Sequence, residues 1–256
     1  MKVGVKTWDD ESFLEHFENK CDFFEVQAIQ KNDYEFLNKF KKPIVIHAEH
    51  GGFGVNFPDS SLHAKNLKSV NFARNLATNV GAKKIIVHPG RLLDKRCSLE
   101  NSKNFIKAIK DDRIIIENHS QPKKGIGSNP DSMKEFLKFT GKKLCFDINH
   151  AIASANSSRE DYIKYIKEYV KLKPVHYHFG GQKLINFFKF YRHDLTHLQL
   201  IDSNIDLKEI IKLIPKDAEI TLETTTSISK TEDDLCIMKK LGWKGFDGKG
   251  YFKKNV

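Results

Sequence analysis

The chain has 256 residues, of which 39% are hydrophobic and 30% charged, and its formal net charge is +10. This length suits a single domain spanning residues 1–256, because α/β barrels reach it without splitting. The amino terminus, MKVGVKTW, has no apolar signal segment, and no stretch approaches the ~20 consecutive apolar residues of a membrane span, so secretion and membrane insertion are disfavoured.

The charge and the cysteines bear on partners and compartment. An excess of 43 Lys and Arg over 33 Asp and Glu favours a partner that carries phosphates, although a solvated Lys-rich surface explains the same excess. The four cysteines form no Cys-x-x-Cys pair, which argues against a disulfide framework and favours a reducing, cytoplasmic setting. Nothing in the sequence implies an obligate protein partner.

Apolar runs bounded by turn residues predict eight strands. Runs without a polar face are typical of buried parallel strands. In chain order the predicted strands cover residues 2–6, 23–29, 43–47, 84–88, 113–117, 143–148, 174–178 and 219–223.

Between these strands, apolar residues recur three and four positions apart, which predicts amphipathic helices. Gly81 and Gly141 stand where the residues just beyond helix ends are expected. The expected helix N-caps are Asp59, Ser98, Asn129, Ser157 and Thr231. The chain is therefore predicted to repeat a strand and a helix eight times.

Eight such units without a long linker predict a single (β/α)₈ TIM barrel. A doubly wound open sheet is the alternative, but it normally has a glycine-rich phosphate loop after its first strand, and here that position reads KTWDDES. In a barrel the carboxyl ends of all strands meet at one face, where residues far apart in the sequence converge.

Five predicted strands end in a side chain that binds metals. Burying such ionisable groups costs too much unless something there uses them. These strand-end residues are His88, Glu117, Asp147, His178 and Glu223. The last four come from successive strands and make a mixed carboxylate and histidine site suited to zinc or manganese.

Further candidate ligands lie nearby. His150 follows Asp147 by three residues, and His88 precedes a Pro-Gly turn that would direct its imidazole into the site. His197 lies in the segment after the seventh strand, where a solvated histidine is the simpler interpretation.

These segments resemble the endonuclease IV family, also called AP endonuclease family 2, within the xylose isomerase-like TIM barrel superfamily. The resemblance rests on HPG at 88–90, ENHS at 117–120, DINHAIASA at 147–155, VHYHF at 175–179, HLQLIDSNID at 197–206 and LETT at 222–225. It covers the fourth to eighth strands, about two thirds of the chain.

The resemblance implies a barrel that holds up to three zinc ions and cleaves DNA 5′ to an abasic site. It implies that Glu117 bridges two metals, with His88 beside the first. Asp147, His178 and Glu223 would hold the second, and His150 and His197 would belong to the third.

Two positions depart from the family pattern. The family reads Asp-x-His at the third metal, whereas Leu195 stands two before His197, and Asp194 is one residue off. A metal-binding histidine is also expected after the third strand, near Asn56 or Phe57. His47 and His50, earlier in that segment, are possible replacements.

The sugar isomerases and epimerases of the same superfamily offer a second interpretation. They use the same quartet with one manganese or similar ion, and Glu117 and Glu223 would then be the catalytic acid and base as well as ligands. Aromatic residues Trp8, Phe53 or Phe57 would cover the small sugar or sugar phosphate. A third interpretation is a barrel that has lost activity and serves as a metal-stabilised binding module.

The nuclease interpretation needs contacts to DNA phosphates, which basic residues of the strand-to-helix loops would supply. Each such residue, taken singly, is also explained as part of a solvated loop. The candidates are Arg91, Lys95, Arg96, Lys123, Lys124 and Arg192. Endonuclease activity with two or three zinc ions is the favoured prediction.

Overall fold

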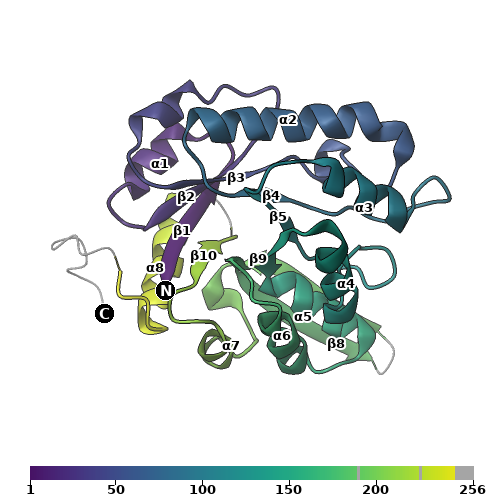
Figure 1. Cartoon of the computed structure of the whole chain (residues 1–256). Coiled ribbons are helices and arrows are strands. Elements are labelled where there is room, and N and C mark those ends of the chain that lie inside the picture. Colours follow the sequence, from purple (N-terminus) through teal and green to yellow (C-terminus); the bar gives the residue numbers. More distant parts are fainter. Residues whose placement is uncertain (189–190, 225–226, 246–256) are drawn as a thin grey trace.

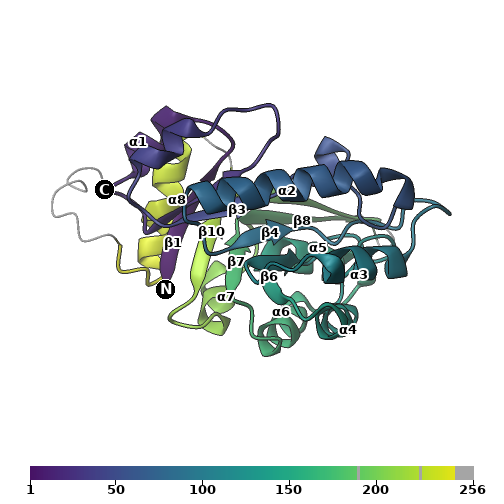
Figure 2. The ribbon, with the colours of Figure 1, turned by 45° about the horizontal axis from the view of Figure 1, so that its top comes forward.

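The computed structural model describes residues 1–188, 191–224 and 227–245, and the side chains of 186–188 and 191–194 lie outside the description. Within these residues, eight parallel strands close into a barrel in the order β1-β10-β7-β6-β5-β4-β3-β2. Helices surround the barrel, with α2 lying along one side of it (Figures 1 and 2). The predicted single (β/α)₈ barrel is confirmed.

The barrel strands lie close to the predicted ranges. They are β1 (Lys2–Thr7), β2 (Phe23–Gln27), β3 (Ile44–His47), β4 (Ile85–Val87), β5 (Ile114–Glu117), β6 (Lys143–Asp147), β7 (His176–Phe179) and β10 (Glu219–Leu222). Three predicted ligands, Glu117, Asp147 and His178, are strand residues, whereas His88 and Glu223 follow their strands directly. All five therefore lie at the carboxyl ends of the barrel strands.

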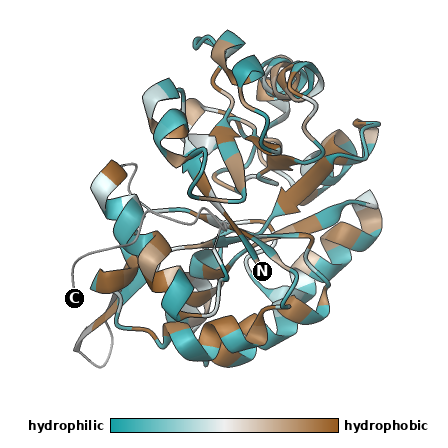
Figure 3. Cartoon of the chain, turned by 90° about the vertical axis from the view of Figure 1, so that its left-hand side faces the viewer, coloured by the Kyte–Doolittle hydropathy of each residue, from teal (hydrophilic) through white to brown (hydrophobic). Residues whose placement is uncertain are grey.

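The helices are α1 (Glu11–Phe17), α2 (His63–Asn79), α3 (Leu99–Ala108), α4 (Pro130–Thr140), α5 (Ile148–Ser158), α6 (Tyr162–Lys171), α7 (Leu207–Leu213) and α8 (Ile228–Lys240). Hydrophobic and hydrophilic residues alternate around them, as helices that cover a core require (Figure 3). No helix among the described residues is long and apolar enough to cross a membrane.

Three of the five predicted N-caps are confirmed. Asp59 caps the short 3₁₀ helix η3 (Ser60–Leu62), and Ser98 and Asn129 cap α3 and α4 through their side chains. The predictions that Ser157 and Thr231 are N-caps are wrong, because Ser157 lies inside α5 and Thr231 inside α8. Asp161 caps α6 instead, and α8 begins after Ser227.

Short elements interrupt the regular repeat. The second unit has the 3₁₀ helix η1 (Glu35–Lys39) where an α-helix is predicted. The 3₁₀ helices η2 (Gly51–Phe53) and η3 follow β3, and η4 (Leu200–Asp202) precedes α7. The segment after β7 is not a plain loop but an antiparallel hairpin, β8 (Gly181–Phe188) and β9 (Tyr191–Leu198).

The inside of the barrel has an apolar and a polar part. Phe23, Val45, Ile86, Ile115 and Cys145 form a small buried cluster separate from the main core between strands and helices. Gly4 leaves room for this cluster, because a Cβ there would lie 2.3 Å from the Phe23 ring. Further along the strands, the interior is filled by ionisable side chains that reach the carboxyl-end face.

Candidate metal centre

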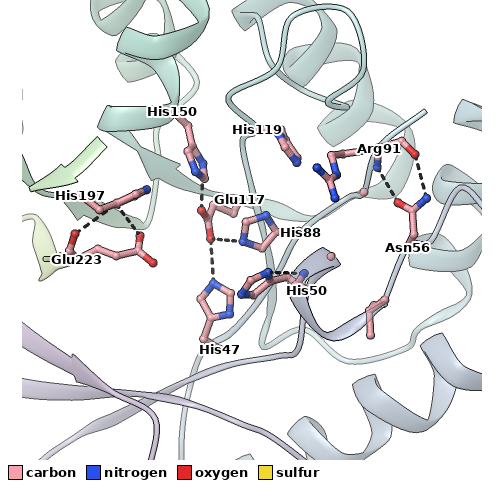
Figure 4. A pocket seen from close by; sticks show the side chains of 14 residues that line it. His47, His50, Asn56, His88, Arg91, Glu117, His119, His150, His197 and Glu223 are labelled. Atoms are coloured by element: carbon pink, nitrogen blue, oxygen red, sulfur yellow. Dashed lines mark hydrogen bonds and ion pairs between the residues drawn. The ribbon is translucent and has the colours of Figure 1, made fainter. Parts of the chain in front are cut away.

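A cavity of about 470 Å³ opens at the carboxyl ends of the strands. The predicted ligands His88, Glu117, His150, His197 and Glu223 line it, together with His47. Two further lining histidines are His50 and His119. Figure 4 shows these side chains converging around Glu117 from different strand ends.

The predicted quartet of Glu117, Asp147, His178 and Glu223 is brought together. One ligand atom from each residue lies within 4.8 Å of the others. Three buried atoms in the group, Asp147 Oδ2, His178 Nδ1 and Glu223 Oε2, make no regular hydrogen bond, although His178 Nδ1 and Glu223 Oε2 lie 3.0 Å apart. Buried polar atoms are normally satisfied, so three such atoms facing one point fit a bound cation.

A second group shares Glu117. His47 Nε2 lies 3.1 Å and His88 Nε2 3.2 Å from Glu117 Oε2. His47 is the last residue of β3, and its position beside Glu117 agrees with the prediction that it could replace the histidine expected later in the chain. Asn56 instead hydrogen-bonds the backbone of Arg91, and Phe57 is buried against Phe105 with ring centroids 4.5 Å apart.

A third group shares Asp147 and adds His150 and His197. Asp147 Oδ1 caps α5 by accepting a hydrogen bond from the His150 backbone at 2.7 Å, which leaves Oδ2 for the site. His197 has a φ of 55°, a region that non-glycine residues seldom adopt and that occurs at functional sites. Leu195 is 40% exposed, and the Asp194 side chain lies outside the described residues.

Three of the histidines are oriented by backbone carbonyls. Nδ1 of His47, His150 and His197 donates to the carbonyls of Ala48, Asn118 and Glu223 at 2.8, 2.8 and 3.2 Å. A histidine that ligates a metal usually donates its other ring N–H in this way. This leaves Nε2 of each ring without such a backbone partner, while Nδ1 of His150 also lies 3.3 Å from Glu117 Oε1.

The pKa shifts reflect the crowding of these groups. Burial raises the pKa of Asp147. Burial would also raise the pKa of Glu117, but the charges of His88 and His178 outweigh it and hold that pKa well below its usual range. Burial lowers the pKa of His50 to about 3 and that of His119 to about 2, so both rings are neutral at pH 7.

Of the predicted DNA-contacting residues whose side chains the structure describes, only Arg91 lines the cavity. Arg91 lines the cavity, and its backbone pairs with that of Gly125 in an isolated bridge between the loops after β4 and β5. Lys95, Arg96, Lys123 and Lys124 are exposed, and Arg96 pairs with Asp94 at 2.7 Å. The side chain of Arg192 lies outside the described residues. Trp8, 55% exposed, packs edge-on against Phe53 near His50.

Sequence reasoning missed several residues of the site. His119 directly follows the Glu-Asn pair of β5, and this adjacency was the available signal. Lys6, Glu25 and His176 lie behind the candidate ligands inside the barrel. They stand within strands that read as apolar, and nothing in their spacing marks which face they occupy.

Comparison with known proteins agrees with this architecture. A family model described as a xylose isomerase-like TIM barrel matches residues 20–241. A D-tagatose 3-epimerase-like protein is similar in structure at 19% identity and a TM-score of 0.72, with 94% of this chain and 97% of that chain covered. Endonuclease IV from Thermus thermophilus is similar at 16% identity and a TM-score of 0.71, with 94% and 98% covered.

A third similar structure is an IOLI protein with a zinc atom, at 14% identity and a TM-score of 0.65, with 94% of this chain and 96% of that chain covered. At such identities these likenesses concern the fold alone. No curated protein sequence matches the chain.

Proposed function

The chain belongs to the xylose isomerase-like TIM barrel family, and from this premise we propose that it is a zinc-dependent phosphodiesterase that cleaves DNA 5′ to an abasic site. The observation that carries the proposal is the pair of histidines, His47 and His88, on Glu117. The quartet alone can hold one ion, so this second group supports the presence of a further ion. Clustered metals are typical of phosphodiester hydrolysis.

The three ligand groups divide the residues of the centre. Glu117 would belong to the first and second ions, and Asp147 to the second and third. Imidazole and carboxylate ligands in groups of three or four suit zinc. When bound, such ions lower the pKa of water and neutralise the charge that grows on a phosphate.

Arg91 is suited to bind a phosphate oxygen beside these groups. Its backbone is fixed by Asn56, which accepts from Arg91 N at 2.8 Å and donates to Arg91 O at 3.0 Å. Its guanidinium makes no hydrogen bond or ion pair with the described residues, so its donors are free for a ligand. Arginine offers planar paired donors that match phosphate.

A metal-dependent sugar epimerase or isomerase is the second candidate, and the quartet together with the similar epimerase-like fold favours it. That chemistry needs Glu117 and Glu223 to exchange protons with a substrate carbon. Lys6 Nζ, however, lies 2.7 Å from Glu223 Oε1. Both oxygens of Glu117 also face histidines, at 3.3 Å for Oε1 and 3.1 Å for Oε2. Glu117 therefore keeps no oxygen away from a histidine, and the one remaining oxygen of Glu223, Oε2, faces the quartet.

Activity on defined substrates tests the proposal. Zinc-loaded protein should nick a labelled duplex that contains one abasic analogue and leave the same duplex without the lesion intact. His88→Ala should lower the nicking rate about 100-fold or more, because even residues behind metal ligands contribute 10- to 100-fold. His63→Ala, an exposed histidine at the start of α2, is the matched control and should retain the rate.

Turnover of a ketose without nicking would overturn the phosphodiesterase assignment. In that event His88→Ala should leave one bound ion in place, since the quartet does not contain His88.

A further inference from the structure

Glu25 is a buried carboxylate behind the metal centre for which neither the family likeness nor the ligand groups around the cavity provide a role. It lies in the middle of β2, opposite Lys6 of β1, and its side chain has no exposed surface. Burying an ionised carboxylate is costly unless charges and hydrogen bonds compensate it. The inside of a TIM barrel is usually filled by branched apolar residues. The contacts of Glu25 therefore require an explanation.

One oxygen of Glu25 holds a metal ligand. Oε2 lies 3.0 Å from Nε2 of His178 and accepts from Thr221 Oγ1 at 2.7 Å, with His176 Nε2 at 3.3 Å. An ionised carboxylate only accepts hydrogen bonds, so His178 must donate from Nε2. The other nitrogen, Nδ1, is the buried atom without a hydrogen-bond partner that faces Asp147 and Glu223.

The second oxygen reaches another metal ligand through Lys6. Glu25 Oε1 lies 3.0 Å from Lys6 Nζ, and the same ammonium donates to Glu223 Oε1 at 2.7 Å. Glu223 Oε2 is thereby left facing the quartet, again without a hydrogen-bond partner. A single carboxylate thus contacts one ligand of the quartet directly and a second through one lysine.

A metal site of its own is the competing explanation. Glu25, His176 and His178 are close enough together to hold an ion. The Lys6 ammonium, however, is within 3.0 Å of Glu25, and a second cation beside it would be repelled. Thr221 also already donates to the oxygen that would ligate. The arrangement fits a support for ligands better than a ligand set.

We infer that Glu25 is a positioning residue that fixes His178 with Nδ1 toward the quartet metal and, through Lys6, turns Glu223 Oε2 toward the same ion. This inference rests on the quartet binding a metal, and it holds for a phosphodiesterase and for an epimerase alike. A carboxylate behind a histidine ligand is known to set its tautomer and its affinity for metal.

Metal binding to the whole chain tests this role. Zinc affinity is measured by competition with a chelator, and the geometry of the site by the visible absorption of the cobalt-substituted protein. Glu25→Leu, which removes the acceptor, should lower the affinity for one zinc ion about 100-fold and change the cobalt spectrum. Glu25→Gln, which keeps an acceptor oxygen, should lower the affinity for that ion only about tenfold. This graded recovery is not expected from a merely structural role.

Glu219→Gln is the matched control. Glu219 is a carboxylate at the opposite end of the barrel that pairs with Lys2 and Lys84, and its variant should bind metal as the wild type does. Thermal unfolding of the metal-free variants shows which of them fold. If both Glu25 variants fail to fold, the Lys6→Gln variant tests the positioning role instead. It should weaken the binding of the same ion.

Unchanged zinc affinity and an unchanged cobalt spectrum in a folded Glu25 or Lys6 variant would refute the positioning role while the metal centre stands. A wild-type chain that binds no metal would instead remove the premise that the inference shares with the proposed function.

Discussion

Glu117 contacts histidines through both of its carboxylate oxygens. Oε2 faces His47, His88 and His178, and Oε1 faces His150. A residue placed in this way can serve more than one ion, which is the arrangement that the family resemblance implies. The proposed centre therefore depends on this glutamate more than on any other side chain.

If His150 is a ligand, as we propose, metal binding should depend on pH. Burial opposes its charge, but Asp147 and Glu117 outweigh that effect and raise the pKa of His150 to about 10 in the metal-free chain. A ligating histidine must be neutral, so binding has to displace a proton at any pH below that value. The affinity of the third group should therefore rise about tenfold per pH unit between about pH 6 and 9.

Titration calorimetry in buffers of different ionisation enthalpy measures this proton release. His150→Ala should remove the pH dependence together with the third ion. Binding of that ion without release of a proton at neutral pH would contradict the raised pKa.

At the level of single residues, the sequence revealed the candidate ligands better than the residues that support them. His88, Glu117, Asp147, His178 and Glu223 were predictable because charged side chains at the ends of apolar runs are costly unless used. Glu25 was not, because its strand reads FFEVQ and its inward direction depends on the register of β1 and β2. From the sequence, His47 is only a possible replacement ligand. The pairing of β3 with β4 in the structure is what brings it toward His88.

Among the elements, the loop after β4 positions two proposed functional residues, His88 and Arg91. Gly90 lies between His88 and Arg91 with a φ of 95°, which glycine tolerates and other residues do not. A Cβ at this position would lie 2.3 Å from Pro58 Cδ and 2.7 Å from Asn56 Oδ1. The close contact allows Asn56 to hold the backbone of Arg91.

Gly90→Ala should therefore destabilise the fold by about 2–5 kcal/mol, as the sum of a left-handed backbone and overpacking. Gly81→Ala is its control, because Gly81 has a φ of 68° but nothing within 4 Å of the added Cβ. That variant should lose about 1–2 kcal/mol. Urea unfolding measures both, and equal losses would show that the contact with Asn56 and Pro58 is not tight.

The hairpin of β8 and β9 is the element that sequence patterns missed. Its residues sit in the eight-unit repeat where a strand-to-helix loop was expected, and a hairpin pairs only with itself. Its second strand carries His197 to the site, in a left-handed conformation that periodicity does not indicate. Elements that depart from the repeat are thus harder to predict than those that form it.

At the scale of the whole molecule, the barrel explains why candidate ligands from five strand ends could be predicted to meet. Parallel strands in one closed sheet all end at the same face, so the order of residues along the chain does not matter for their convergence. The number of bound ions distinguishes the two proposed enzyme classes. This number depends on His47, His88, His150 and His197 rather than on the quartet. The quartet is shared by both proposed enzyme classes.

Zinc per chain, measured by elemental analysis after the protein is loaded and dialysed, tests the multi-metal centre most directly. We predict two or three zinc ions in the wild type, and one fewer in His47→Ala, because the group of His47, His88 and Glu117 would be lost while the quartet remains. A single ion per chain that His47→Ala leaves unchanged would contradict the account.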